Sequence, residues 1–105
     1  MLTLHRLDSF NADFNQQYCW YLERAGEIVA EHFLYAATAT LCLLAEHPEL
    51  GRRRKFRHPL LRDIRSFPVK SPFHKTLVFY RVTENSLVAW RLMHGARDLP
   101  KRLAA

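Results

Sequence analysis

The sequence predicts a small α+β domain: an N-terminal strand and a helical hairpin, followed by a small antiparallel sheet of three further strands. Apolar residues recur at helical spacing through the first half of the chain, and alternating segments follow in the second half. Helices that precede antiparallel strands are typical of an α+β architecture. The 105 residues suffice for one core. We therefore expect a single domain over residues 1–105, with 99–105 as a short tail.

The N-terminal half indicates one strand and two helices. Residues 2–7 alternate in polarity and predict the strand, and Asp8 or Ser9 is placed to cap the helix after it. Gly26 ends this helix, and a second helix is expected from about Glu27 to Glu46, where His47-Pro48 ends it. The expected buried stripes are Phe10, Phe14, Tyr18, Tyr21, Leu22 and Ala25 in the first helix and Val29, Phe33, Ala36, Ala37, Thr40, Leu41 and Leu44 in the second.

The C-terminal half predicts three strands. The first lies within residues 61–69, where Pro68 favours a sheet edge or a bulge. The other two form a hairpin over residues 75–93, with a turn at 83–85 in which Asn85 best tolerates a left-handed backbone. Because a lone hairpin is marginally stable in water, we expect the two helices to cover one face of this sheet.

Positive charge is concentrated in one segment. The formal net charge is +6, from 16 basic and 10 acidic residues. Seven of the basic residues and one acidic residue, Asp63, lie between positions 52 and 65, so the remaining nine of each sign cancel. The seven are Arg52, Arg53, Arg54, Lys55, Arg57, Arg62 and Arg65. Such a segment attracts nucleic-acid phosphates or an acidic protein, although a solvated basic loop is the alternative interpretation.

Several classes of protein are not indicated. The sequence has no phosphate-binding or dinucleotide-binding glycine motif, no HExxH and no closely spaced zinc ligands, so neither a cofactor nor a metal is expected. Cys19 and Cys42 fall in different helical segments and are expected to be buried, reduced thiols. No apolar run approaches the roughly 20 residues of a membrane span, and the N-terminus does not have the pattern of a signal peptide. We expect a cytoplasmic protein that does not bind membranes.

Four segments resemble, in order, the RelE/ParE family of bacterial toxins: LLAEHPELGRRR, LRDIRSFPV, LVFYRV and RLMHGARDLP. The resemblance covers roughly residues 14–102. It implies the toxic half of a type II toxin–antitoxin pair, neutralised by a small acidic antitoxin that lies across the sheet and the basic face. The pattern SFPV…FYRV…HGARDLP is similar to the ParE-like branch, which poisons DNA gyrase. In that branch the segment after the last strand carries the toxicity, which would make Arg97, Asp98, Lys101 and Arg102 target contacts.

The alternative within the family is a RelE-like ribonuclease that cleaves mRNA on the ribosome without a metal. Such a reaction needs a base for the ribose 2′-hydroxyl, cations for the phosphate and an acid for the leaving oxygen. Glu46 or His94 would be the base, Arg62 and Arg81 the phosphate clamp, and His94 alternatively the acid. Packing beneath the C-terminal turn is the other interpretation of His94. A non-toxic basic domain that binds nucleic acid or protein is the remaining alternative.

Overall fold

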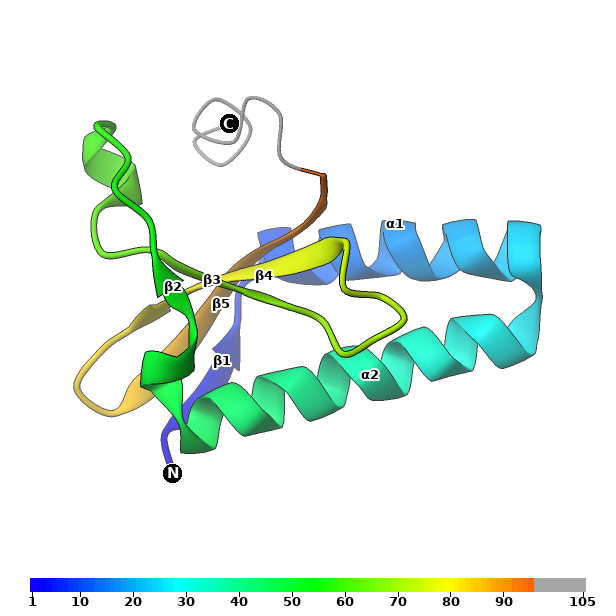
Figure 1. The fold of residues 1–105 in the computed structure, drawn as a ribbon, viewed down its shortest axis with the longest axis horizontal. Helices are drawn as coiled ribbons and strands as arrows, with labels where there is room; N and C mark the ends of the chain where they lie inside the picture. Colours follow the sequence, from blue (N-terminus) through cyan, green and yellow to red (C-terminus); the bar gives the residue numbers. More distant parts are fainter. Residues whose placement is uncertain (96–105) are drawn as a thin grey trace.

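A computed structural model of the chain describes residues 1–95, which form two long helices and one five-stranded sheet (Figure 1). The predicted α+β class and the order of the elements are confirmed. Short 3-10 turns at Pro48–Leu50 and Pro59–Leu61 flank the first of the internal strands. The elements are β1 (Thr3–Arg6), α1 (Asp8–Ala25), α2 (Glu27–Glu46), β2 (Arg52–Arg53), β3 (Arg65–Pro68), β4 (Thr76–Val82) and β5 (Ser86–His94).

The sheet is mixed, with strand order β1-β5-β4-β3-β2. β1 pairs in parallel with β5, and every other pair is antiparallel. The two-residue β2 adds a fourth strand after the helices, where the sequence predicted three. β2 pairs only with Ser66 and Arg65, so Pro68 lies beyond it, where β3 has an open edge. The proline is therefore placed where its missing N–H removes no sheet hydrogen bond.

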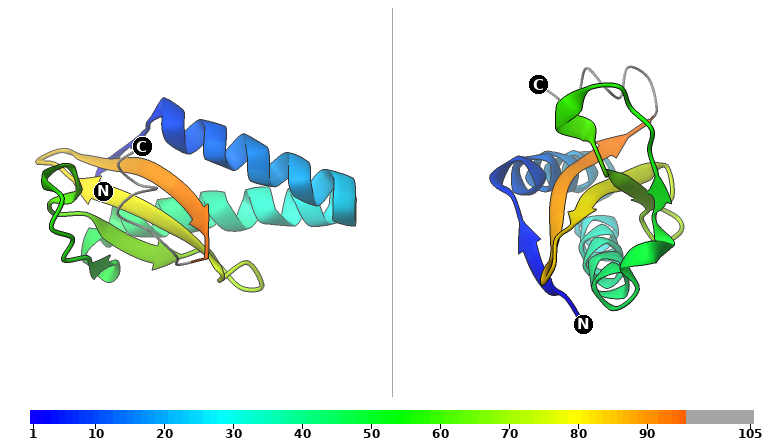
Figure 2. Two further views of the ribbon diagram at one scale, coloured as in Figure 1. Left: turned by 90° about the horizontal axis from the view of Figure 1, so that it is seen from above. Right: turned by 90° about the vertical axis from the view of Figure 1, so that its left-hand side faces the viewer.

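The two helices form the expected hairpin on one face of the sheet (Figure 2). Gly26 has φ +92°, a conformation that favours glycine, and it joins the helices without further residues. Leu7 is the residue at the N-cap of α1, and no side chain caps this end. The predicted cap at Asp8 or Ser9 is therefore wrong, because the Ser9 hydroxyl donates to the carbonyl oxygen of Trp90 (2.8 Å) instead.

The sheet separates two groups of buried residues. The larger group lies between the sheet and the helices, and the smaller one lies on the opposite face beneath residues 56–64. The first contains Phe10, Phe33, Leu41, Leu44, Val69, Phe73, Val78, Tyr80, Leu87, Ala89 and Leu92. The second contains Leu61, Ile64, Phe79 and Met93. Leu22 and Ala25, expected in the buried stripe of α1, are exposed because the helical hairpin extends past the sheet (Figure 1).

A bulge in β5 changes which face its side chains occupy. Phe79 pairs with Arg91 and Tyr80 pairs with Ala89, so Trp90 is an extra residue in the ladder. As a result Ala89 and Leu92 both face the helices, whereas simple alternation would have separated them.

Three expectations about individual residues are wrong. Cys19 and Cys42 are exposed, because both lie outside the buried stripes of their helices. Asn85 does not have a positive φ; among the non-glycine residues of the described chain only Asp63 does, at 63°. The turn before β5 is instead closed by Thr83, whose amide donates to Ser86 (2.8 Å).

Within residues 1–95, one helix, α2, is long and apolar enough by length and composition to cross a membrane. Seven of its residues, including Phe33, Leu41 and Leu44, are buried in the structure. The apolar composition of α2 therefore fits a core helix, which a globular protein also requires.

Candidate functional site

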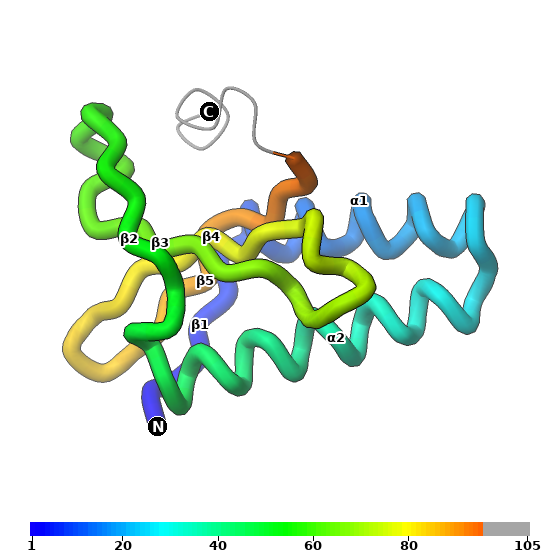
Figure 3. The backbone as a smooth tube through the Cα atoms, in the orientation of Figure 1, coloured from blue at the N-terminus to red at the C-terminus, as the bar shows by residue number. Residues whose placement is uncertain are grey.

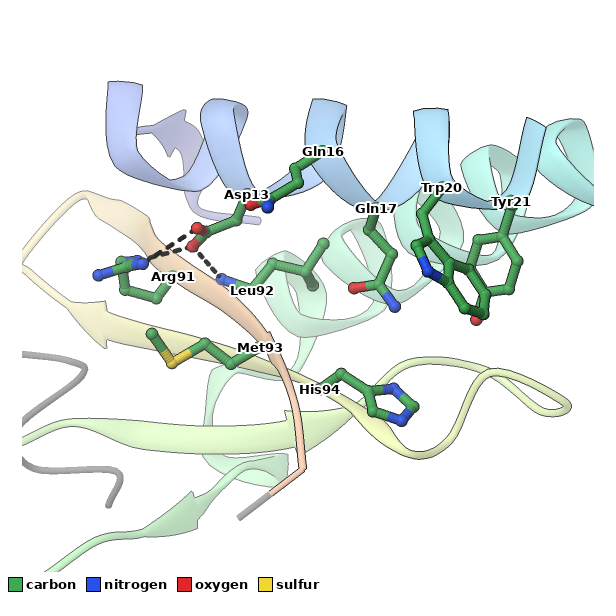
Figure 4. A pocket seen from close by; sticks show the side chains of 9 residues that line it. All are labelled: Asp13, Gln16, Gln17, Trp20, Tyr21, Arg91, Leu92, Met93 and His94. Carbon is green, nitrogen blue, oxygen red and sulfur yellow. Dashed lines mark hydrogen bonds and ion pairs between the residues drawn. The ribbon is translucent and has the colours of Figure 1, made fainter. Parts of the chain in front are cut away.

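A groove between α1 and β5 has a volume of about 870 Å³ (Figure 4). Aromatic and apolar side chains meet several polar ones along it. Its lining residues are Asp13, Gln16, Gln17, Trp20, Tyr21, Arg91, Leu92, Met93 and His94. We refer to these nine residues as the α1–β5 groove.

A row of polar residues on α1 fixes one wall of the groove against the sheet. Ser9, Asp13 and Gln17 recur every four residues and therefore share one side of the helix. Asp13 accepts hydrogen bonds from Arg91 Nε (2.6 Å) and Nη2 (3.0 Å) and from the amide of Leu92 (3.0 Å). The hydrogen bond from Arg91 to Asp13 raises the pKa of the Arg91 guanidinium, which therefore stays protonated.

The bulge in β5 explains why α1 bonds to the strand there. Both the carbonyl of Trp90 and the amide of Leu92 are bound by α1 side chains, Ser9 and Asp13. β1 pairs with β5 only as far as Ala89, so the last residues of β5 have no strand on that side. Beyond Ala89 this edge of β5 therefore faces α1 and the groove instead of a strand.

Beside this edge the groove combines an apolar surface with a buried polar contact. Trp20 is 50% exposed, and its ring packs edge-on against Tyr21. Gln17 donates to the buried hydroxyl of Thr76 (3.1 Å), which lies 3.4 Å from Nδ1 of His94. Such a mixture suits a peptide segment that offers apolar side chains and backbone hydrogen bonds.

The second candidate surface is the basic segment, residues 52–64, here called the basic arm. It projects away from both helices (Figure 3). Three arginines in or beside the arm bond to the protein itself. Arg54 Nε donates to Ser66 Oγ (2.7 Å), and Arg65 Nη1 donates to the carbonyl of Gly51 (2.7 Å). Arg81, on β4, donates to the carbonyls of Leu60 (2.8 Å) and Arg62 (2.9 Å).

The remaining cations of the arm face solvent. Arg53 forms an exposed ion pair with Asp63 at 3.4 Å, a contact that contributes little to stability. Burial, followed by the charge of Arg52, lowers the pKa of Arg54. The other exposed cations are Arg52, Lys55, Arg57 and Arg62.

The residues predicted for a ribonuclease do not form one cluster. His94 lines the α1–β5 groove, whereas Glu46 lines a separate cavity of about 360 Å³ between α2 and β3. The guanidinium of Arg81 is bound to backbone carbonyls and stacks over Trp90, 5.3 Å from the ring centroid. Arg62 is exposed on the basic arm.

The predicted target contacts Arg97, Asp98, Lys101 and Arg102 lie outside the described residues. In the described part of the chain, no group of three or more His, Cys, Asp or Glu residues is placed to hold a metal ion.

Sequence reasoning missed Asp13, Gln17 and Trp20, which build the groove. A signal for two of them was present, because Ser9, Asp13 and Gln17 form a polar row at four-residue spacing beside the apolar stripe of the same helix. The bonding of this row to β5 depends on the bulge, which the sequence pattern did not reveal.

Comparisons with known proteins identify the class to which this fold and groove belong. A family model, described as the ParE toxin of the type II toxin–antitoxin system parDE, matches residues 6–99. The chain therefore belongs to the ParE toxin family and is the toxin component of a type II toxin–antitoxin pair, with an antitoxin as its partner. A search of curated protein sequences finds no match.

Two solved structures share the fold at low sequence identity. A chain described as the chromosomal ParDE TA system from P. aeruginosa has a TM-score of 0.73 and 17% identity; the match covers 91% of this chain and 98% of that one. A copper-bound L66S mutant toxin from Helicobacter pylori has a TM-score of 0.56 and 16% identity, over 90% of this chain and 94% of that one. At these identities the structures indicate the fold alone.

Proposed function

We propose that this toxin acts in the cytoplasm by inhibiting DNA gyrase, and that its antitoxin neutralises it from the α1–β5 groove. The observation that carries the choice of target is the match of the ParE toxin model to residues 6–99. The predicted contacts for gyrase remain Arg97, Asp98, Lys101 and Arg102.

The scattered positions of the ribonuclease candidates also favour gyrase over mRNA as the target. A phosphate clamp requires free N–H donors, and Arg81 directs its guanidinium at the carbonyls of Leu60 and Arg62. A base and an acid must lie on opposite sides of one scissile bond. Glu46 and His94 line two different cavities, which is a poor arrangement for that chemistry.

The groove favours a peptide partner. Trp20 is half-exposed and offers the kind of large aromatic surface that commonly dominates the binding energy of a protein interface. The groove also runs beside the end of β5, which has no neighbouring strand beyond Ala89, and an extended peptide suits such a position. An antitoxin segment that presents apolar side chains to Trp20 and polar groups to the end of β5 would match these features.

The test of the proposed target is a gyrase supercoiling assay with purified toxin, ATP and relaxed plasmid. We expect the full chain to block supercoiling and to leave linearised plasmid. A chain that lacks residues 99–105 should lose both effects and still unfold in one cooperative thermal transition, because the helices and the sheet lie within residues 1–95. Glu46→Gln, at an exposed position on α2 outside the basic arm, is the control and should inhibit like the full chain.

Two results would contradict the proposal. Unchanged supercoiling by a folded full-length chain would remove gyrase as the target. Full inhibition by the truncated chain would remove the tail from the mechanism and direct attention to the described domain.

A further inference from the structure

The cations in and beside the basic arm fall into two groups: some bond to the protein and hold the arm in shape, and the others are exposed to solvent. Arg54, Arg65 and Arg81 bond to Ser66 or to backbone carbonyls, so their positions are fixed by the protein itself. Four others, Arg52, Lys55, Arg57 and Arg62, are exposed. A loop that merely solvates charge would not require three further arginines to brace it.

The brace makes the arm a defined structure along much of its length. The amide of Arg54 donates to the carbonyl of Ile64 (2.9 Å), which closes the base of the arm as a two-stranded ribbon. Nδ1 of His58 accepts from the amide of Leu60 (3.1 Å) and starts the 3-10 turn near the tip. Leu61 and Ile64 anchor the underside against the sheet. Cations held on such a scaffold lose little conformational freedom on binding.

From this arrangement we propose that the basic arm binds the sugar–phosphate backbone of duplex DNA. The proposal rests on the proposed function, because DNA held by gyrase is the duplex that the toxin would meet. The arm would hold the DNA while other residues contact the enzyme. Phosphates attract Lys and Arg whatever the base sequence, so the binding should be independent of sequence and strongly dependent on salt.

The composition of the arm favours nucleic acid over an acidic peptide. Its large apolar side chains Leu61 and Ile64 are buried, and Leu60, 58% exposed, is an isolated apolar contact. A peptide partner needs more apolar surface than this, and the α1–β5 groove provides it. The arm begins at β2, at the edge of the sheet opposite β1, and residues 56–64 cover the face of the sheet opposite the helices (Figure 2).

The test measures binding of a fluorescein-labelled random-sequence DNA duplex by anisotropy between 50 and 300 mM NaCl, roughly the range over which such contacts weaken. The test variant carries Arg52→Gln, Arg57→Gln and Arg62→Gln. The matched control carries Arg6→Gln, Lys70→Gln and Lys75→Gln, which remove the same charge from exposed positions elsewhere. Circular dichroism checks that both variants fold.

We expect the arm variant to lower the slope of log K against log salt by about 0.9 for each lost contact, or roughly 2.7 in all. The control should change the slope much less. An equal decrease of this slope in both variants would overturn the proposal, because net charge alone would then explain the DNA binding. Tighter binding of single-stranded RNA of the same length, or loss of antitoxin binding instead of DNA binding, would also overturn it.

The same protein samples distinguish failure of the DNA-binding proposal from failure of the proposed gyrase target. If the full chain binds duplex DNA through the arm but leaves gyrase active, the proposed target is wrong and the DNA-binding proposal is retained. If it inhibits gyrase and the arm variant binds DNA as tightly as the control, the arm proposal alone fails.

Discussion

Tyr80 shows how a single side chain connects the sheet to the basic arm. Its ring is fully buried, and its hydroxyl donates to the carbonyl of Pro48 (2.7 Å) and accepts from the amide of Gly51 (2.8 Å). A side chain at position 51 would overlap the Tyr80 ring, so glycine is required where the arm begins. The phenol therefore fixes the chain at the point where it leaves α2 and enters β2.

Replacing Tyr80 with Phe should lower the free energy of unfolding by about 1–3 kcal/mol at pH 7, because the buried amide of Gly51 loses its acceptor. Burial raises the pKa of Tyr80 above its ordinary value. The folded state then keeps a proton that the unfolded chain releases near pH 10. The contribution of Tyr80 is complete below that pH and is lost as the pH rises through the folded-state pKa.

Urea unfolding of the wild type and of Tyr80→Phe at pH 7, 9, 10 and 11 checks this prediction. Tyr35→Phe, at an exposed position, is the control for loss of a hydroxyl. The difference in the free energy of unfolding between the wild type and Tyr80→Phe should narrow above about pH 10. A difference that stays constant up to pH 11 would contradict the assigned role.

The elements differ in how far the sequence determines them. Gly26 and His47-Pro48 interrupt helix geometry locally, so the sequence predicted the bounds of α2, Glu27–Glu46, as the structure has them. The bulge at Trp90 was not predicted, because nothing in the alternation of β5 marks it. Its backbone groups are satisfied by Ser9 and Asp13, which lie about 80 residues earlier in the chain. A contact of this kind becomes visible only when α1 is placed on the sheet.

The α1–β5 groove allows a prediction about the antitoxin. Trp20→Ala removes a half-exposed ring and should weaken the complex with the cognate antitoxin at least about 30-fold, the equivalent of 2 kcal/mol. Tyr35→Ala, on the outer face of α2 and 67% exposed, is the matched control and should bind normally. Isothermal titration calorimetry measures both, and equal affinities for the two variants would place the antitoxin elsewhere.

The whole molecule presents two surfaces, a groove between α1 and β5 and a basic arm over the sheet face opposite the helices, and the sequence anticipated only the second. Charge can be counted directly, so the basic arm was predicted from composition, although its division into bracing and exposed arginines was not. The groove requires a helix from the start of the chain to meet a strand from its end. Such long-range packing defines the antitoxin surface proposed for this ParE-family toxin.

The central claim is that this toxin poisons gyrase and leaves mRNA intact. The most direct measurement induces the toxin in bacteria without its antitoxin, then recovers plasmid and total RNA from the same culture within minutes. The account predicts relaxed and linearised plasmid together with uncut mRNA. Supercoiled plasmid with mRNA cut at ribosome-bound codons would contradict it and return Arg62, Arg81, Glu46 and His94 to the centre of the mechanism.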